Sequence, residues 1–192
     1  MQSTSHKTHE KGFATGLLTF RNFVIESARA IEIDRFLKDH ARAGLISPQY
    51  YLALVKELQE ICKVREFKTH NLVVLTGRSA IAGGLGNEGS TAITFGALGD
   101  DDTAANAADT DLGNEVARKG VARRARTNNV LTLDFFYSQL DTDGTYEEFG
   151  AFIGGTLAAD SGTLFNRSLT GGWTKTNNEA MTVSLEITIN QG

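Results

Sequence analysis

The sequence predicts a mainly β protein, an antiparallel β-sandwich of the jelly-roll type preceded by an N-terminal helical arm. The strongest signal is the strict alternation of apolar and polar residues over residues 179–190, which is typical of a strand with one buried face. Its apolar face consists of Met181, Val183, Leu185, Ile187 and Ile189. Before residue 66, apolar residues recur at helical spacing instead. The 20 glycines and single proline suit many tight β connections.

Composition argues against two kinds of partner. The chain has 192 residues and a formal net charge of -4, so it offers no overall attraction to nucleic acid or anionic lipid.

An apolar run near the N-terminus is interrupted at Arg21, which argues against a signal peptide or a membrane span. The single cysteine, Cys62, cannot form an internal disulfide and is interpreted as a small core residue.

Three segments are predicted. Residues 1–19 form a flexible tail, residues 20–66 a helical hairpin arm, and residues 67–192 the β-sandwich domain. His6 and His9 in the tail could share a metal, but with no second pair of ligands a solvated terminus is favoured. The arm is expected to make assembly contacts, and the β domain to fold without it.

The arm contains two helical patterns. The first covers residues 20–43 and has two offset apolar stripes, which predict a bend near Glu32. His40 lies on the second stripe, where a partly buried structural histidine is favoured over a ligand. The second helix begins at Ser47 and Pro48, a capping residue followed by a residue that needs no amide partner. Its apolar stripe consists of Tyr51, Leu54, Val55, Leu58, Ile61 and Cys62.

Strand patterns dominate the rest of the chain. They cover residues 67–75, 90–98, 115–125, 130–138 and 146–153, with a helical turn possible at residues 79–82. Residues 84–89 (GLGNEG) match the glycine spacing of a dinucleotide-binding motif. That motif requires a helix after the glycines, and a strand is expected there, so a flexible loop is favoured and no cofactor is assigned.

Five aspartates are concentrated in one loop. They are Asp100, Asp101, Asp102, Asp109 and Asp111. Such oxygen-rich loops can hold calcium, but the spacing fits no EF-hand and a solvated connection is favoured. A second pair, Asp141 and Asp143 before Gly144, is interpreted as a turn between strands.

One basic run follows the acidic loop. It consists of Arg118, Lys119, Arg123, Arg124 and Arg126. In a strand these charges would divide between two faces instead of lining a groove for nucleic acid. The favoured interpretation is a basic edge strand that resists unwanted pairing or meets an acidic neighbour.

No catalytic, cofactor-binding or metal-binding residue is assigned, and the chain is expected not to be an enzyme. Glu147 and Glu148 are the most tempting acid pair for a hydrolase, but adjacent residues in a strand point to opposite faces. A carbohydrate-binding module stays open as a rival hypothesis. Its candidate contact residues are the aromatic side chains Trp173, Tyr137 and Tyr146.

Several segments resemble a widespread family of tailed-bacteriophage structural proteins. They are "THNLVVLTGR" from residue 69, "FGALGDDDTAANAADTDLGNEVARKGV" from residue 95, "TYEEFGAFIGG" from residue 145, "SGTLFNRSL" from residue 161 and "EAMTVSLEITIN" from residue 179. The motifs follow the same order as in that family and cover about residues 69–190.

The resemblance implies a non-enzymatic virion component of the tail, fibre or collar type. It implies other virion proteins as partners, a homo-oligomeric state, and a location in the virion after synthesis in the host cytoplasm. Alternatives are a decoration or cement protein of the phage head, or a carbohydrate-binding module that recognises a glycan of the host surface. The family implies no catalytic residues.

Overall fold

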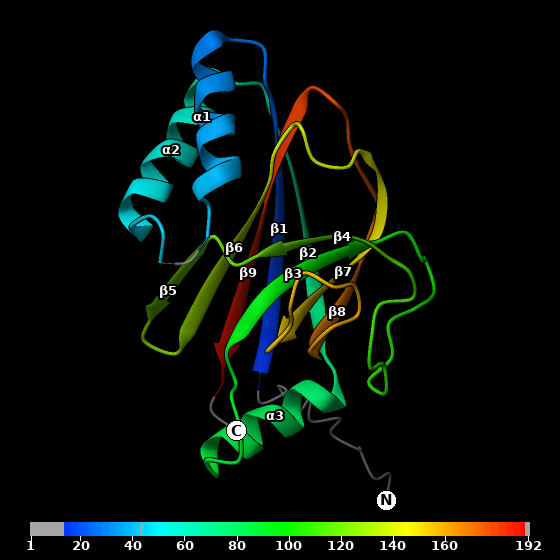
Figure 1. The fold of residues 1–192 in the computed structure, drawn as a ribbon. Helices are drawn as coiled ribbons and strands as arrows, with labels where there is room; N and C mark the ends of the chain where they lie inside the picture. The colour runs from blue at the N-terminus through cyan, green and yellow to red at the C-terminus, as the bar shows by residue number, and fades with distance from the viewer. Residues whose placement is uncertain (1–13, 43, 191–192) are drawn as a thin grey trace, which may run out of the picture.

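The computed structural model describes residues 14–42 and 44–190 as nine strands and three helices (Figure 1). In chain order these are β1 (Ala14–Val24), α1 (Ala28–His40), α2 (Pro48–Ile61), β2 (Val64–Val73), α3 (Leu75–Leu85), β3 (Ile93–Gly99), β4 (Glu115–Gly120), β5 (Arg123–Thr127), β6 (Val130–Tyr137), β7 (Gly144–Ile153), β8 (Thr163–Lys175) and β9 (Glu179–Ile189). The fold is mainly β and antiparallel, as the sequence predicts.

The nine strands form one sheet in the order β4-β3-β7-β8-β2-β1-β9-β6-β5, curled into a half-barrel (Figure 1). The predicted sandwich, with two separate sheets, is therefore replaced by one curled sheet. Its end strands, β4 and β5, are consecutive in the chain and are joined by Val121 and Ala122. The Val121 N–H donates to the Thr94 carbonyl over 3.0 Å, and the Ala122 N–H to the Asp134 carbonyl over 2.7 Å. These bonds hold the two ends of the sheet close together.

The helix predicted from residue 20 is wrong at its start, because residues 20–24 belong to β1. This strand lies between β2 and β9 and pairs with β9 along its whole length. Leu18 and Phe20 face the inner core, and Phe23 near the end of β1 packs beneath the helices. The apolar residues of β1 do not alternate regularly with polar ones, so its sequence lacks the clean pattern that identifies β9. Residues 14–19 of the predicted tail also lie in β1, and residues 1–13, with His6 and His9, lie outside the described residues.

The predicted helical hairpin is present as α1 and α2, but it lies between β1 and β2 and not ahead of the sheet. Ser27 and Ser47 cap the two helices, since each hydroxyl oxygen accepts a first-turn N–H over 3.1 Å. Helix α1 runs unbroken, so the bend predicted near Glu32 is absent.

The helical pair covers the outer face of its own sheet. Tyr51, Leu54, Val55 and Leu58 are the buried stripe of α2, and with α1 they pack against Phe23, Phe136 and Ala180 of the strands. The predicted boundary at residues 66 and 67 falls inside β2, and residues 14–24 run through the middle of the sheet. Strand pairing therefore does not follow the division into tail, arm and β domain.

The inner core lies in the hollow of the half-barrel. Phe149 meets Phe20 edge-on at a centroid distance of 6.2 Å, and it packs at a tilt against Phe135 at a centroid distance of 5.6 Å. The predicted apolar face of β9 is confirmed by four buried residues, Met181, Val183, Leu185 and Ile187, whereas Ile189 at the strand end is 37% exposed. The opposite face is not wholly solvated, because Thr182 is buried.

Helix α3 lies across the lower end of the half-barrel (Figure 1). Its close contact with β8 depends on Gly77, where a Cβ would lie 2.2 Å from the carbonyl oxygen of Phe165. The strand predicted over residues 115–125 is two strands, because at Val121 the chain crosses from one end of the sheet to the other.

Candidate functional site

A buried charge network joins the acidic loop to the sheet. Arg167 of β8 is only 4% exposed, and its Nε lies 2.6 Å from Glu148 of the neighbouring strand β7. Its Nη1 lies 2.9 Å from Asp109, and its Nη2 is 3.9 Å from Asp101. The guanidinium also donates to the Thr103 carbonyl over 3.1 Å. One arginine thus fastens several points of the loop to two strands.

Glu148 is the carboxylate that links Arg167 to the end of the acidic loop. It is fully buried and accepts the backbone N–H groups of Gly113 and Asn114 over 3.2 and 3.0 Å. Leu112 beside them is buried with Phe152 and Leu164 in a small outer core. These contacts anchor the loop to the sheet, while most of residues 100–111 are exposed, as predicted for a solvated connection.

The carboxylates proposed for calcium are instead engaged with nitrogen donors. Asp101 accepts the Thr103 N–H over 2.6 Å, and hydrogen bonds with Thr103 lower the pKa of the Asp101 carboxyl. Asp109 accepts the Asn106 N–H over 2.9 Å in addition to Arg167. Within residues 14–42 and 44–190, no group of three His, Cys, Asp or Glu side chains is placed to share a metal ion.

The basic run is divided among several partners. Arg118 pairs with Glu115 at 2.6 Å with both side chains 3% exposed, and its guanidinium lies 4.3 Å from the Phe152 ring centre. Lys119 pairs with Asp141 at 2.6 Å. Arg123 pairs with Asp134 at 2.6 Å, while Arg124 donates to the Ile93 carbonyl. β4 and β5 are the end strands of the sheet, as expected for a basic edge.

The two glutamates considered for a hydrolase are separated by their surroundings. Glu148 is enclosed by Arg167 and backbone amides, whereas Glu147 is half-exposed and lies in the β-bulge between Tyr146 and Glu148. Asp143 at the β6–β7 connection pairs with the buried Lys175 at 3.0 Å, which anchors the predicted turn.

The aromatic residues considered for glycan binding do not form an exposed platform. Tyr137 and Tyr146 are each 1% exposed, and their hydroxyls donate to the carbonyls of Gly96 and Thr142. Trp173 is half-buried, stacks on Phe67 at 5.7 Å and donates its Nε1–H to Asn22. These side chains fill the fold and are not available for stacking on a sugar.

The glycine motif at residues 84–89, Cys62 and His40 have surroundings that favour structural roles. The glycines of residues 84–89 end helix α3 at Gly86, and no helix follows them, so the dinucleotide motif lacks its phosphate-binding helix. Cys62 is half-buried at the end of α2, and burial raises the pKa of its thiol. His40 is exposed, contrary to the prediction, and stacks on Phe36 at 4.4 Å.

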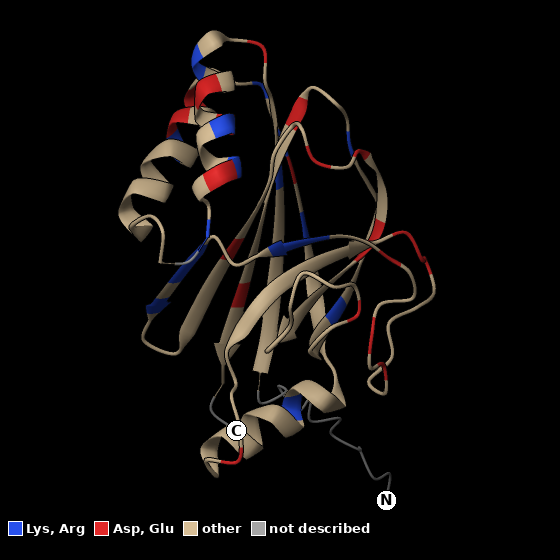
Figure 2. Cartoon of the chain, viewed as in Figure 1, with Lys and Arg blue, Asp and Glu red and all other residues tan. Residues whose placement is uncertain are grey.

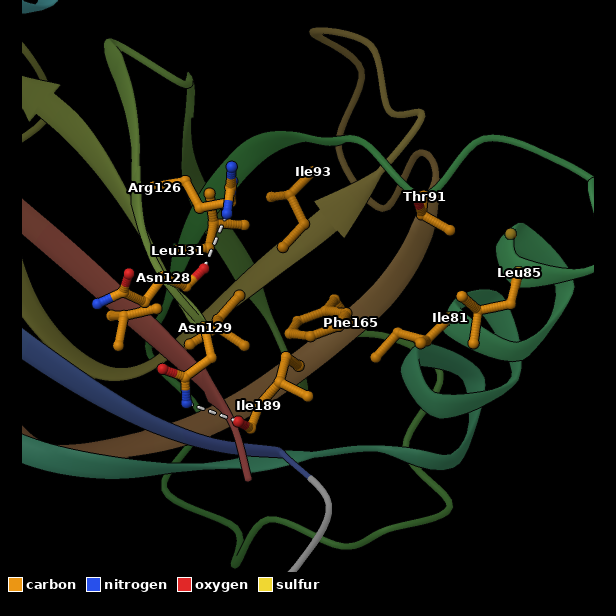
Figure 3. A pocket seen from close by; sticks show the side chains of 13 residues that line it. Ile81, Leu85, Thr91, Ile93, Arg126, Asn128, Asn129, Leu131, Phe165 and Ile189 are labelled. Atoms are coloured by element: carbon orange, nitrogen blue, oxygen red, sulfur yellow. Dashed lines mark hydrogen bonds between the residues drawn. The ribbon is translucent and has the colours of Figure 1, made fainter. Parts of the chain in front are cut away.

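An apolar pocket of about 380 Å³ opens at the lower end of the half-barrel (Figure 3). Ile81 and Leu85 of α3 line one side, and Ile93, Phe165 and Ile189 contribute strand side chains. The one charged residue in its lining is Arg126, which donates to the carbonyl of Asn128. The pocket offers apolar contact, one cation and the hydroxyl of Thr91, and its lining contains no carboxylate.

The sequence did not reveal Arg167 as the centre of the charge network. The available signal was an arginine inside the apolar strand pattern "TLFNRSL", since a charge in a central strand requires a buried partner. Its partners lie 19 and 58 residues away, and no local pattern identifies them.

Within the described residues, no helix is both long and apolar enough to cross a membrane. A scan against protein-family models and searches of curated proteins and of solved structures found no match to this chain.

Proposed function

We propose that this chain is a non-enzymatic structural component of a tailed-bacteriophage virion, of the tail, fibre or collar type, which assembles through subunit contacts. One observation carries the proposal: three of the five segments that bear the family resemblance form β4, β3, β7 and β8, which are consecutive neighbours in the sheet. Segments that belong to one spatial unit support a shared fold better than scattered short matches do.

The charged residues of these segments favour a structural role over a catalytic one. Glu115, Arg118, Glu148 and Arg167 are enclosed in ion pairs with one another or with the acidic loop. A catalytic acid or base must reach a substrate. These four side chains contact strands and loops of their own chain, so they stabilise a rigid subunit.

Mass spectrometry of purified tailed particles tests the proposal. We expect the chain to remain in washed particles at a fixed ratio to the other virion proteins, and deletion of its gene to give incomplete particles or particles that do not infect. Absence from intact, infectious particles would overturn it. Turnover of a polysaccharide that is lost on a single Asp or Glu substitution would favour an enzyme instead.

A further inference from the structure

A second pocket, of about 440 Å³, lies between the end of α1 and the strands β3, β4 and β5. We call it the cationic groove. Its lining contains five cationic residues, Lys38, Arg42, Arg118, Lys119 and Arg124, and neither aspartate nor glutamate. Phe95, Phe136 and Leu157 form much of its apolar wall.

Only part of this positive charge is neutralised inside the chain. Arg118 and Lys119 are paired with Glu115 and Asp141. Lys38, Arg42 and Arg124 have no carboxylate partner within the described residues, although Arg124 donates one hydrogen bond to the Ile93 carbonyl. The C-terminal dipole of α1 accounts for a cation such as Lys38, but not for Arg124, which comes from a strand.

The acidic loop carries negative charge that is not paired inside the described part of the chain. Asp101 and Asp109 pair with Arg167, whereas Asp100, Asp102 and Asp111 have no cationic partner within the described residues. Asp100 and Asp102 are exposed. Because the network of Arg167 and Glu148 fixes the loop, these carboxylates are presented on a rigid base.

The groove and the loop lie at opposite ends of the same β3–β4 hairpin. Thr94, Phe95 and Gly120 at one end line the groove, and residues 100–114 connect the strands at the other end. Figure 2 shows red segments along the loop and blue segments on β4 and β5. Phe95 of the groove and Asp100 of the loop are five residues apart, roughly 17 Å at about 3.3 Å per residue, and no residue of the loop lines the groove of its own chain.

We propose that the cationic groove binds the acidic loop, Asp100 to Asp111, of a second copy of this chain. The contact joins two different surfaces, so it is heterologous and builds a ring or a filament instead of a closed twofold dimer. This inference rests on the proposed assembly function and names the contact through which it occurs.

Charge reversal with rescue tests the contact by sedimentation velocity. We expect wild-type chain to self-associate in about 0.1 M salt and to dissociate in about 1 M salt, where the Debye length falls from about 10 Å to about 3 Å. Lys38→Glu with Arg42→Glu should weaken association about tenfold or more. Asp100→Lys with Asp102→Lys should do the same, and mixing the two double variants should restore a heterologous pair that neither forms alone.

The matched control is Lys56→Glu with Lys63→Glu, which reverses two exposed charges away from the groove and should leave association unchanged. Thermal melts show that each variant is folded. A wild-type chain that stays monomeric in low salt, or folded double variants that fail to pair with each other, would overturn this contact. Recovery of the chain in particles despite such a result would leave the virion role standing, so the two failures can be told apart.

Discussion

Loss of Arg167 should destabilise the fold strongly, because its ion pair with Glu148 is buried. Arg167→Met would leave the buried Glu148 without its cation, and breaking a buried ion pair costs about 3–5 kcal/mol. Arg29→Met is a matched control, because the Arg29–Glu57 pair is exposed and the loss of such a pair should change the stability far less. Urea unfolding measures both. Similar losses for the two variants would contradict the role assigned to the network.

Two carboxyls should respond to pH with opposite signs. Burial raises the pKa of Asp34 above its ordinary 3.8, despite hydrogen bonds from Ser138 and Gln139. Burial would also raise the pKa of Glu179, but hydrogen bonds from Thr176, Asn22 and Arg65 together lower it below 4.5. The stability that protonated Asp34 contributes is therefore fully present below pH 3.8 and is lost as the pH rises through its folded pKa. The stability that ionised Glu179 contributes is present above pH 4.5 and is lost as the pH falls through its folded pKa.

Unfolding free energies at several pH values, compared with wild type, test this linkage. We expect the free energy of unfolding of Asp34→Asn to increase relative to wild type as pH rises from about 4 towards 7. That of Glu179→Gln should decrease relative to wild type as pH rises towards about 4.5. Parallel slopes for the two variants would show that one of these environments is wrongly assigned.

The residue types of the charge network were visible in the sequence, but their partners were not. The acidic loop and the basic run stood out by composition, yet Glu148 finds its cation on the next strand and its amide donors in a loop 34 residues earlier. Such pairs depend on strand order, which short-range periodicity does not contain. For the same reason Tyr137 and Tyr146 were considered as surface residues although they are buried.

Helix α3 offers a test at the scale of a single element. Gly77→Ala would place a methyl group against the Phe165 carbonyl and should destabilise the fold by about 1–3 kcal/mol. Gly83→Ala in the same helix is the control, because its nearest neighbour would be 3.8 Å from the new Cβ. Alanine there should stabilise by about 0.5–1 kcal/mol. Thermal melts that move in the same direction for both variants would contradict this packing.

Elements with a regular apolar period were predictable, and those without one were not. Helix α2 and strand β9 each show a regular apolar stripe, and both elements are confirmed, although Ile61 of the predicted α2 stripe is exposed. In β1 the apolar residues do not alternate regularly with polar ones, so its sequence resembles the start of a helix. The sequence predicts only a helical turn at residues 79–82, whereas α3 covers Leu75–Leu85 and contains three glycines, which weaken its helical pattern.

At the scale of the whole molecule, the β strands should not fold without the first 67 residues. A chain beginning at Lys68 would lack β1, and β9 would lose the partner that it pairs with from Ala14 to Val24. It would also expose Phe136 and Ala180, which the helices cover. We expect this shortened chain to aggregate or to give no cooperative melt by circular dichroism. A chain beginning at Phe13 is the control, because every described strand is retained.

The pairing of β1 with β9 also governs when the protein can fold during its synthesis. Roughly 160 residues separate the two partners along the chain, and ribosomes add about 5–20 residues per second. The apolar side chains of β1 therefore emerge about 8 to 30 s before β9 can cover their edge. Throughout that interval β2 can pair with one edge of β1, but the edge that β9 covers stays unpaired. A chaperone that holds extended apolar segments at the ribosome exit would therefore raise the yield of this protein, and would do so by acting on its first strand.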